Sequence, residues 1–196
     1  MINQFGTIFF CPSGLAASKF VLGAARLSVL RLECLVDFAL RDFQSVDFET
    51  LWRIDQKCFP PGIAYTKAEL KAYVSAARVF TVVAEGGPGG AGIADSGRES
   101  VTILGFIIAQ ANRRGIGHII TIDVLPEGRR SGIGSSLLGA AEQRLRNLHC
   151  DRIYLETAVD NMAAQKFYER HGYAVTKTIP GYYSNGVDAF VLMKDL

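Results

Sequence analysis

The most informative stretch of this sequence is residues 124–134, Val-Leu-Pro-Glu-Gly-Arg-Arg-Ser-Gly-Ile-Gly. A β-branched, apolar run at 118–124 predicts a strand before it, and an amphipathic run at 131–148 predicts a helix after it. Glycines let the backbone approach a ligand closely, and the first N–H groups of a helix have no partner within the helix. The stretch therefore predicts an anion-binding site where a strand turns into a helix.

Two common kinds of anion loop do not fit this stretch. A dinucleotide fingerprint needs a third glycine at position 137, where this chain has Leu137. A nucleotide P-loop needs Gly-Lys followed by Ser or Thr, and the stretch contains no lysine. The pattern Arg-x-x-Gly-x-Gly, from Arg129 to Gly134, instead resembles the pyrophosphate loop of the GNAT superfamily of acetyltransferases, which use acetyl-CoA.

Three further segments match that superfamily in order and spacing. Tyr154–Thr157, then Asn161, then Phe167–Tyr173 resemble its second signature: a strand, an asparagine near the next helix start, and a Tyr-Glu-x-x-Gly-aromatic helix end. Residues 181–189, which contain Gly-Tyr-Tyr and Asp-Ala, resemble the acceptor hairpin of N-terminal acetyltransferases, including the ribosomal-protein alanine acetyltransferases. Phe59–Pro60 matches an element of the peptide site in the same group.

The resemblance covers residues 37–196 and leaves residues 1–36 without a counterpart. We therefore expect one acetyltransferase domain at 37–196 and an N-terminal extension at 1–36 that is dispensable for activity. The resemblance implies the GNAT fold of the α/β (α+β) class. In that fold a mixed, mostly antiparallel sheet carries helices on both faces, with a V-shaped splay between two central parallel strands.

Periodicity and turn residues place the elements along this domain. Thr66 with Glu69 predicts a capping box, Asp160 predicts a helix N-cap, and Gly86–Gly97 predicts a turn longer than a hairpin needs. The predicted order is βααβββαβαββ. Strands are expected at 37–43, 78–85, 101–111, 118–124, 152–157, 173–178 and 187–193, and helices are expected to begin near 47, 67, 131 and 160.

The resemblance implies roles for three side chains in the aminolysis of a thioester. Tyr168 stands at the position of the acid that protonates the leaving sulfur, although helical spacing alone favours a core tyrosine. Glu156 stands at the position of the base that accepts the amine proton through water. His118 begins the preceding strand, where related enzymes carry a second proton acceptor, and a surface histidine at a strand edge is an equal alternative. An α-amine with a pKa near 8 needs only a weak base.

The resemblance also implies the binding residues. The cofactor set is Val124, Arg129, Arg130, Ser131, Gly132, Ile133, Gly134 and Asn161, and the acceptor set is Phe59, Pro60, Tyr182 and Tyr183. The chain departs from the family in two places. Its peptide loop, residues 59–65, is longer than usual, and Asp123 replaces the small or apolar residue usual beside the pantetheine. The Asp123 carboxylate faces the acceptor amine or points out of the sheet, and the sequence leaves both open.

Composition limits the other partners. A net charge of +2, with Lys and Arg scattered among acids, provides no basic face for nucleic acid. Four cysteines without a Cys-x-x-Cys pair and three histidines without a His-x-x-x-His pair predict reduced thiols and no metal site. The N-terminal run lacks the ~20 uninterrupted apolar residues of a spanning helix, and residues 1–11 lack the positive charge of a secretory signal. We therefore expect a cytoplasmic monomer or homodimer without a nucleic-acid or membrane partner.

The resemblance implies an acetyl-CoA-dependent N-acetyltransferase, and the spacing of cysteines and histidines predicts that it uses no metal. The predicted acceptor is the N-terminal α-amine of a protein or peptide, which attacks directly in a ternary complex. Acetylation of a small-molecule amine or a lysine side chain is the alternative within the family. The Tyr182–Tyr183 hairpin argues against it, because such a loop would partly roof the acceptor groove and favour an extended peptide end. A non-catalytic acyl-CoA-binding sensor is the other alternative, and the presence of Tyr168 and Glu156 argues against that.

Overall fold

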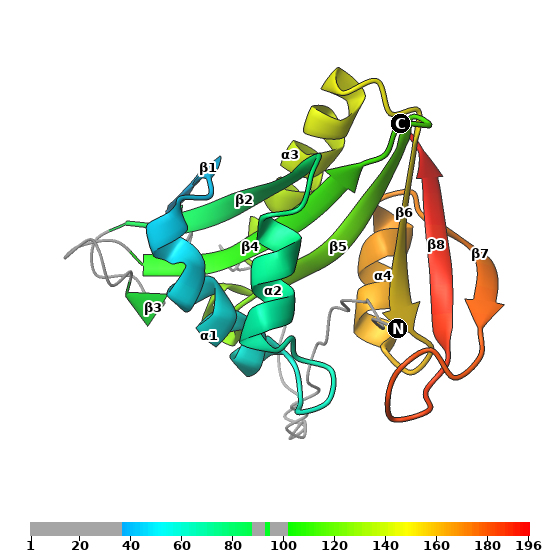
Figure 1. Cartoon of the computed structure of the whole chain (residues 1–196), viewed down its shortest axis with the longest axis horizontal. Coiled ribbons are helices and arrows are strands. Elements are labelled where there is room, and N and C mark those ends of the chain that lie inside the picture. Colours follow the sequence, from blue (N-terminus) through cyan, green and yellow to red (C-terminus); the bar gives the residue numbers. More distant parts are fainter. Residues whose placement is uncertain (1–36, 88–92, 95–101) are drawn as a thin grey trace, which may run out of the picture.

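The computed structural model describes residues 37–87, 93–94 and 102–196 (Figure 1). The extension predicted at residues 1–36 lies outside the described residues. The strands are β1 (Phe38–Asp42), β2 (Val79–Gly86), β3 (Ile93–Ala94), β4 (Thr102–Ala111), β5 (Ile116–Val124), β6 (Arg152–Ala158), β7 (Ala174–Ile179) and β8 (Ala189–Asp195). The helices are α1 (Phe48–Cys58), α2 (Lys67–Val74), α3 (Ile133–Asn147) and α4 (Met162–Arg170), with short 3-10 turns at Ser45–Asp47 and Pro126–Gly128.

The predicted order of elements is confirmed with one addition, the short strand β3. It pairs with β4 where the sequence predicted only a turn. A two-residue strand is too short to show a period of two, and its pairing depends on the neighbouring strand rather than on its own pattern. The sequence therefore carried no signal for it.

The strands form one mixed sheet in the order β1-β2-β4-β5-β6-β8-β7, with β3 beside β4. Every pairing is antiparallel except that between β5 and β6. Helix α3 carries the chain from the end of β5 back to the start of β6, and such a crossover is what parallel neighbours require. The mixed, mostly antiparallel sheet predicted from the sequence is confirmed.

The two parallel strands separate along their length. β5 and β6 pair from Ile116 with Arg152 to His118 with Tyr154, and no pairing follows. β5 then continues to Val124 alongside β4 alone, and Figure 1 shows the two ribbons diverging from their paired end. The predicted splay is confirmed. It leaves N–H and C=O groups on the inner edge of β5 to be paired by something other than β6.

The helices divide between the two faces of the sheet (Figure 1). Leu51 of α1 packs with Phe106 and Ile108 of β4 in the core beneath α1 and α2. Leu138 of α3 packs with Ile107 in the core beneath α3 and α4, as expected where successive strand residues point to opposite faces. Burying each such leucine contributes about 1.5–3 kcal/mol, so both layers hold the sheet that positions the site.

The helix caps agree with the sequence at α2 and differ by one residue at α4. Thr66 Oγ1 accepts from Glu69 N at 3.2 Å, and Glu69 Oε2 accepts from Thr66 N at 2.9 Å, so the predicted capping box is confirmed. The prediction for α4 was wrong, because Asn161 rather than Asp160 is the N-cap. Its Oδ1 accepts from Ala164 N at 3.1 Å. Asp and Asn are equally good caps, so adjacent residues of these types cannot be separated by propensity.

Candidate active site

The loop between β5 and α3 turns through two left-handed residues. Arg130 has φ of 64°, and Gly132, the N-cap of α3, has φ of 89°. Glycine adopts this conformation without the steric cost that other residues meet, which explains its place at 132. Ser136 N donates to Gly132 O at 2.9 Å, so the N–H groups ahead of it have no partner within the helix.

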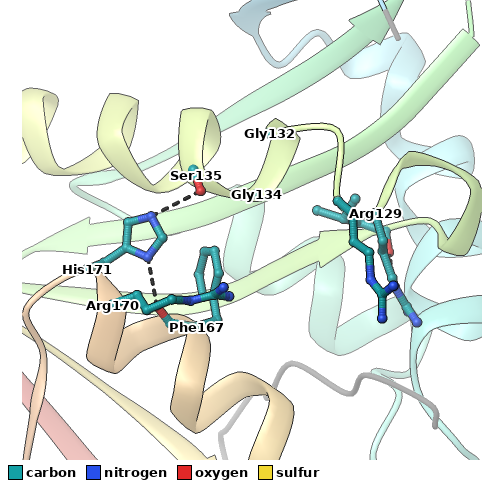
Figure 2. Close-up of a pocket in the computed structure, with 9 residues that line it drawn as sticks. Arg129, Gly132, Gly134, Ser135, Phe167, Arg170 and His171 are labelled. Carbon is teal, nitrogen blue, oxygen red and sulfur yellow. Dashed lines mark hydrogen bonds between the residues drawn. The ribbon is translucent and has the colours of Figure 1, made fainter. Parts of the chain in front are cut away.

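A pocket of about 470 Å³ lies at this start of α3 (Figure 2). The lining comes from the end of β5, the loop, the first turn of α3 and the end of α4: Val124, Arg129, Arg130, Gly132, Gly134, Ser135, Phe167, Arg170 and His171. A Cβ atom built at Gly134 would lie 3.5 Å from the Phe167 ring, so a larger side chain there would occupy the pocket. The pocket contains three arginines and the N–H groups at the start of α3 that have no partner within the helix. Gly132 and Gly134 leave room beside them, so the pocket suits a bulky anion such as a pyrophosphate.

Not every residue predicted for the cofactor lines this pocket. Ile133 is fully buried in the core. Ser131 instead ties the loop together, since its Oγ donates to the carbonyl of Gly128. Asn161 is 4% exposed and caps α4 through Oδ1, while its Nδ2 is buried with no hydrogen-bond partner. That unused donor is the feature that suits Asn161 to a ligand contact.

Arg129 braces the end of β5. Its Nε donates to the carbonyl oxygen of Val124 at 3.0 Å, and Cys58 Sγ lies 3.6 Å from the same oxygen. Both residues belong to the set that the sequence predicted for the cofactor. In the structure the Arg129 side chain and the Val124 carbonyl are hydrogen-bonded to each other, and both residues line the pocket.

Four residues that line the pocket were not in the set predicted for the cofactor: Ser135, Phe167, Arg170 and His171. His171 joins two helices, because its Nδ1 lies 2.7 Å from Phe167 O and its Nε2 lies 3.0 Å from Ser135 Oγ (Figure 2). Phe167, Arg170 and His171 were visible as part of the second signature. Their meeting with the start of α3 depends on tertiary packing and has no sequence signal.

The structure brings His118 and Glu156 together where β5 and β6 part. His118 Nε2 lies 2.8 Å from Glu156 Oε2, and the His118 ring stacks on Tyr154 with centroids 4.3 Å apart. The Glu156 side chain is 8% exposed and that of His118 is 18% exposed. His118 is therefore a partly buried partner of Glu156 rather than a free surface histidine. A histidine–carboxylate pair with some access to solvent is suited to passing a proton to water.

Tyr168 is almost completely buried in α4, at 2% exposure. Its ring packs edge-on against Phe167 and Tyr173. Burial raises the pKa of its phenol well above 10, and Tyr183 and Asp123 add to the effect. The phenol therefore stays protonated at neutral pH, which is the state an acid must start from.

The two predicted acceptor segments lie against each other. Ser184 Oγ, in the connection between β7 and β8, donates to Gly62 O at 2.8 Å in the connection between α1 and α2. The rings of Tyr182 and Tyr183 meet edge-to-face with centroids 5.0 Å apart. Phe59 is buried in the core beneath α1, whereas Pro60 is exposed.

The departure at Asp123 is settled in part, since its side chain is 1% exposed and does not reach solvent. No group of three or more His, Cys, Asp or Glu residues that could hold a metal ion occurs in the described ranges. No helix in the described part of the chain is long and apolar enough to cross a membrane.

Comparison with known proteins agrees with this geometry. An N-alpha-acetyltransferase of Saccharolobus solfataricus is 38% identical over 81 residues, which cover 41% of this chain and 48% of that protein. The chain thus matches about half the length of this curated relative. The solved Ard1 structure from Thermoplasma volcanium superposes with a TM-score of 0.68 at 25% identity, covering 81% of this chain and 97% of that one.

A ribosomal-protein alanine N-acetyltransferase from Escherichia coli shares the fold, with a TM-score of 0.65 at 20% identity over 81% of this chain and 94% of that one. Residues 48–173 match the acetyltransferase (GNAT) family itself. That match spans the strand-to-helix loop, the splayed strands and the end of α4. The chain belongs to the GNAT family of acetyltransferases.

Proposed function

We propose that this protein transfers the acetyl group of acetyl-CoA to the N-terminal α-amine of a protein or peptide. The observation that carries the proposal is the position of the anion pocket. It lies at the end of β5, on the strand whose inner edge is left unpaired by the splay. A long ligand with a pyrophosphate at α3 and an extended arm along β5 would satisfy both features at once.

The pyrophosphate would be held by the N–H groups at the start of α3 and by Arg130, with Gly132 and Gly134 allowing close approach. Asn161 Nδ2 would give its unused N–H to the pantetheine arm. Acetyl-CoA supplies an activated acyl group on a thiol of pKa about 8.5, which is a tolerable leaving group.

Glu156, paired with His118, would accept the proton that the amine loses as its nitrogen bonds to the acetyl carbon. Tyr168 would give its phenolic proton to the sulfur as the carbon–sulfur bond breaks. No covalent enzyme intermediate is needed, because the amine attacks the thioester directly.

An N-terminal acceptor is supported by two observations. The Ser184–Gly62 hydrogen bond ties the β7–β8 connection to the peptide loop. Two connected loops would partly cover an acceptor groove, which would favour an extended chain end over a side chain presented from a folded surface. Relatives named N-alpha-acetyltransferase support the same acceptor.

Transfer of labelled acetyl from acetyl-CoA to peptides that differ only in the first residue tests the proposal. The expected result is transfer to at least one peptide with a free N-terminus and none to its N-terminally blocked twin. Transfer to free amino acids or polyamines, with none to any peptide, would contradict it. We place the activity in the cytoplasm, which cell fractionation tests.

A further inference from the structure

Asp123 carries a buried carboxyl oxygen that nothing in the described structure uses. Its Oδ1 accepts from Thr121 Oγ1 at 2.6 Å. Its Oδ2 is buried with no hydrogen-bond partner. An unpartnered buried oxygen costs the folded state free energy, so its retention calls for a ligand that completes it.

The side chain lies on the face of the sheet that α1 and α2 cover. Its cross-strand partner in β4 is Phe106, which packs in the core beneath those helices, and cross-strand partners share a face. The charge of Asp123 also acts on Cys58 at the end of α1. Asp123 therefore points toward the acceptor loops, on the splayed part of β5 and away from α3.

Two more polar atoms are buried without a partner on this side of the sheet. The Tyr65 hydroxyl, in the peptide loop, and Asp55 Oδ1, in α1, are buried without a hydrogen-bond partner. Burial raises the pKa values of Tyr65 and of Tyr168, the proposed acid, and the charge of Asp123 adds to both shifts. Burial raises the pKa of Asp123 itself well above its usual range, and the Asp55 charge adds to the effect.

We propose that Asp123 is the acceptor-selecting residue of this protein: its Oδ2 accepts a hydrogen bond from an N–H or O–H donor on the first residue of the incoming chain. This inference rests on the proposed function, since it names what the acceptor must carry. Two donors share that chemistry, the α-ammonium group of any peptide and a side-chain hydroxyl such as that of serine. A donor held at a buried carboxyl group forms a strong hydrogen bond, because little water competes for it.

The test compares the wild-type protein with Asp123→Asn, which keeps the shape of the side chain but exchanges the accepting oxygen for a donating amide or a neutral carbonyl. Acetyl transfer is measured on two peptides that begin with Ser and with Ala and are otherwise identical. The matched control is Asp42→Asn, on the outer strand β1, where the carboxylate is exposed and paired with Arg144. Calorimetric affinity for acetyl-CoA and the melting temperature are measured for all three proteins.

Asp123→Asn should raise the peptide KM about 10- to 100-fold, as expected when a buried donor loses its acceptor, with acetyl-CoA affinity unchanged and no loss of melting temperature. An equal rise for both peptides identifies the α-ammonium as the donor. A rise for the Ser peptide alone identifies the hydroxyl. The control should match the wild type throughout.

An unchanged KM for both peptides in Asp123→Asn would overturn the proposal. So would a weaker acetyl-CoA affinity, which would assign Oδ2 to the cofactor, or a lowered melting temperature, which would make Asp123 a structural residue. If the Asn variant does not fold, Asp123→Ala, which carries the small side chain usual in the family, takes its place with the same expectations. Failure of the wild-type protein to acetylate any peptide would instead overturn the proposed function. The role proposed for Asp123 would then fall with it.

Discussion

Tyr168 and Asp123 are both almost completely buried, and burial shifts both pKa values upward because the charged form of each loses solvation. A CoA thiolate formed beside Tyr168 would be desolvated in the same way. The pKa of the thiol that accepts the proton would therefore rise together with that of the phenol that donates it. A buried tyrosine can therefore protonate the sulfur although its pKa lies far above neutrality.

Tyr168→Phe tests this role. It should lower kcat about 10²–10⁴-fold, the usual contribution of a general acid, while acetyl-CoA affinity stays almost intact because only a transition-state interaction is removed. Steady-state kinetics on a peptide, run where chemistry limits the rate, and calorimetry with acetyl-CoA measure the two quantities. Nearly full turnover in the variant would return Tyr168 to a purely structural role in the core.

The His118–Glu156 pair makes a prediction about pH. Glu156→Gln should cost most activity at low pH, where few α-amines of pKa about 8 are already neutral, and should recover partly as the pH rises. His118→Ala should shift the same pH–rate profile, because it removes the partner 2.8 Å from the carboxylate. An unchanged profile in His118→Ala would remove the histidine from proton transfer.

At this scale the sequence predicted residues with a motif and missed residues defined by packing. Tyr168, Glu156 and Gly134 stand in recognisable patterns, and the pair of His118 with Glu156 could be suggested from strand order. The meeting of His171 with Ser135 could not, because it depends on how α4 packs against α3. Asp123 was visible as a departure from the family, but its direction required the register of β4 and β5.

The element proposed to bind the cofactor is the start of α3. Gly134→Glu should abolish acetyl-CoA binding, since it brings a side chain and a negative charge into the pocket. Gly139→Glu is the matched control, because Gly139 lies on the same helix at an exposed position where an added Cβ meets nothing within 4 Å. Calorimetry should show no binding for the first variant and wild-type affinity for the second. Equal affinity in the two variants would mean that the pyrophosphate lies elsewhere.

Element boundaries also mark the limit of the sequence. Long periodic segments such as α3 and β4 were predicted to within a few residues, because many positions contribute to each pattern. The predicted N-cap of α4 was one residue too early and β3 was not predicted, since each depends on one or two positions. The splay of β5 from β6 followed from the family resemblance alone, because both strands read as ordinary apolar runs.

The free energy of unfolding of the whole molecule should fall as the pH rises from about 4 toward neutrality. Burial raises the pKa of Asp55 from 3.8 to about 7 and raises that of Asp123 as well. Between about pH 4 and pH 7 the folded state therefore binds more protons than the unfolded state, so the free energy of unfolding falls as the pH rises, by an amount on the order of a few kcal/mol.

Chemical denaturation at pH 5 and pH 8 measures this fall. Asp123→Asn should make it smaller, because one of the two carboxyls that must ionise in the core is gone. Asp42→Asn should keep the wild-type fall, since the Arg144 contact lowers the pKa of Asp42 and places its titration below this window. Stability that rises from pH 5 to pH 8 in the wild type would contradict the burial of these carboxyls.

The acceptor amine is decided most directly by locating the transferred acetyl group. A peptide with a free N-terminus and one internal lysine, and a twin with its N-terminus blocked, are incubated with the protein and labelled acetyl-CoA, and tandem mass spectrometry assigns the label. The predicted result is label on the α-nitrogen of the free peptide and none on the blocked twin. Label on the lysine of both peptides would contradict N-terminal acetylation, while leaving the acetyl-CoA site in place.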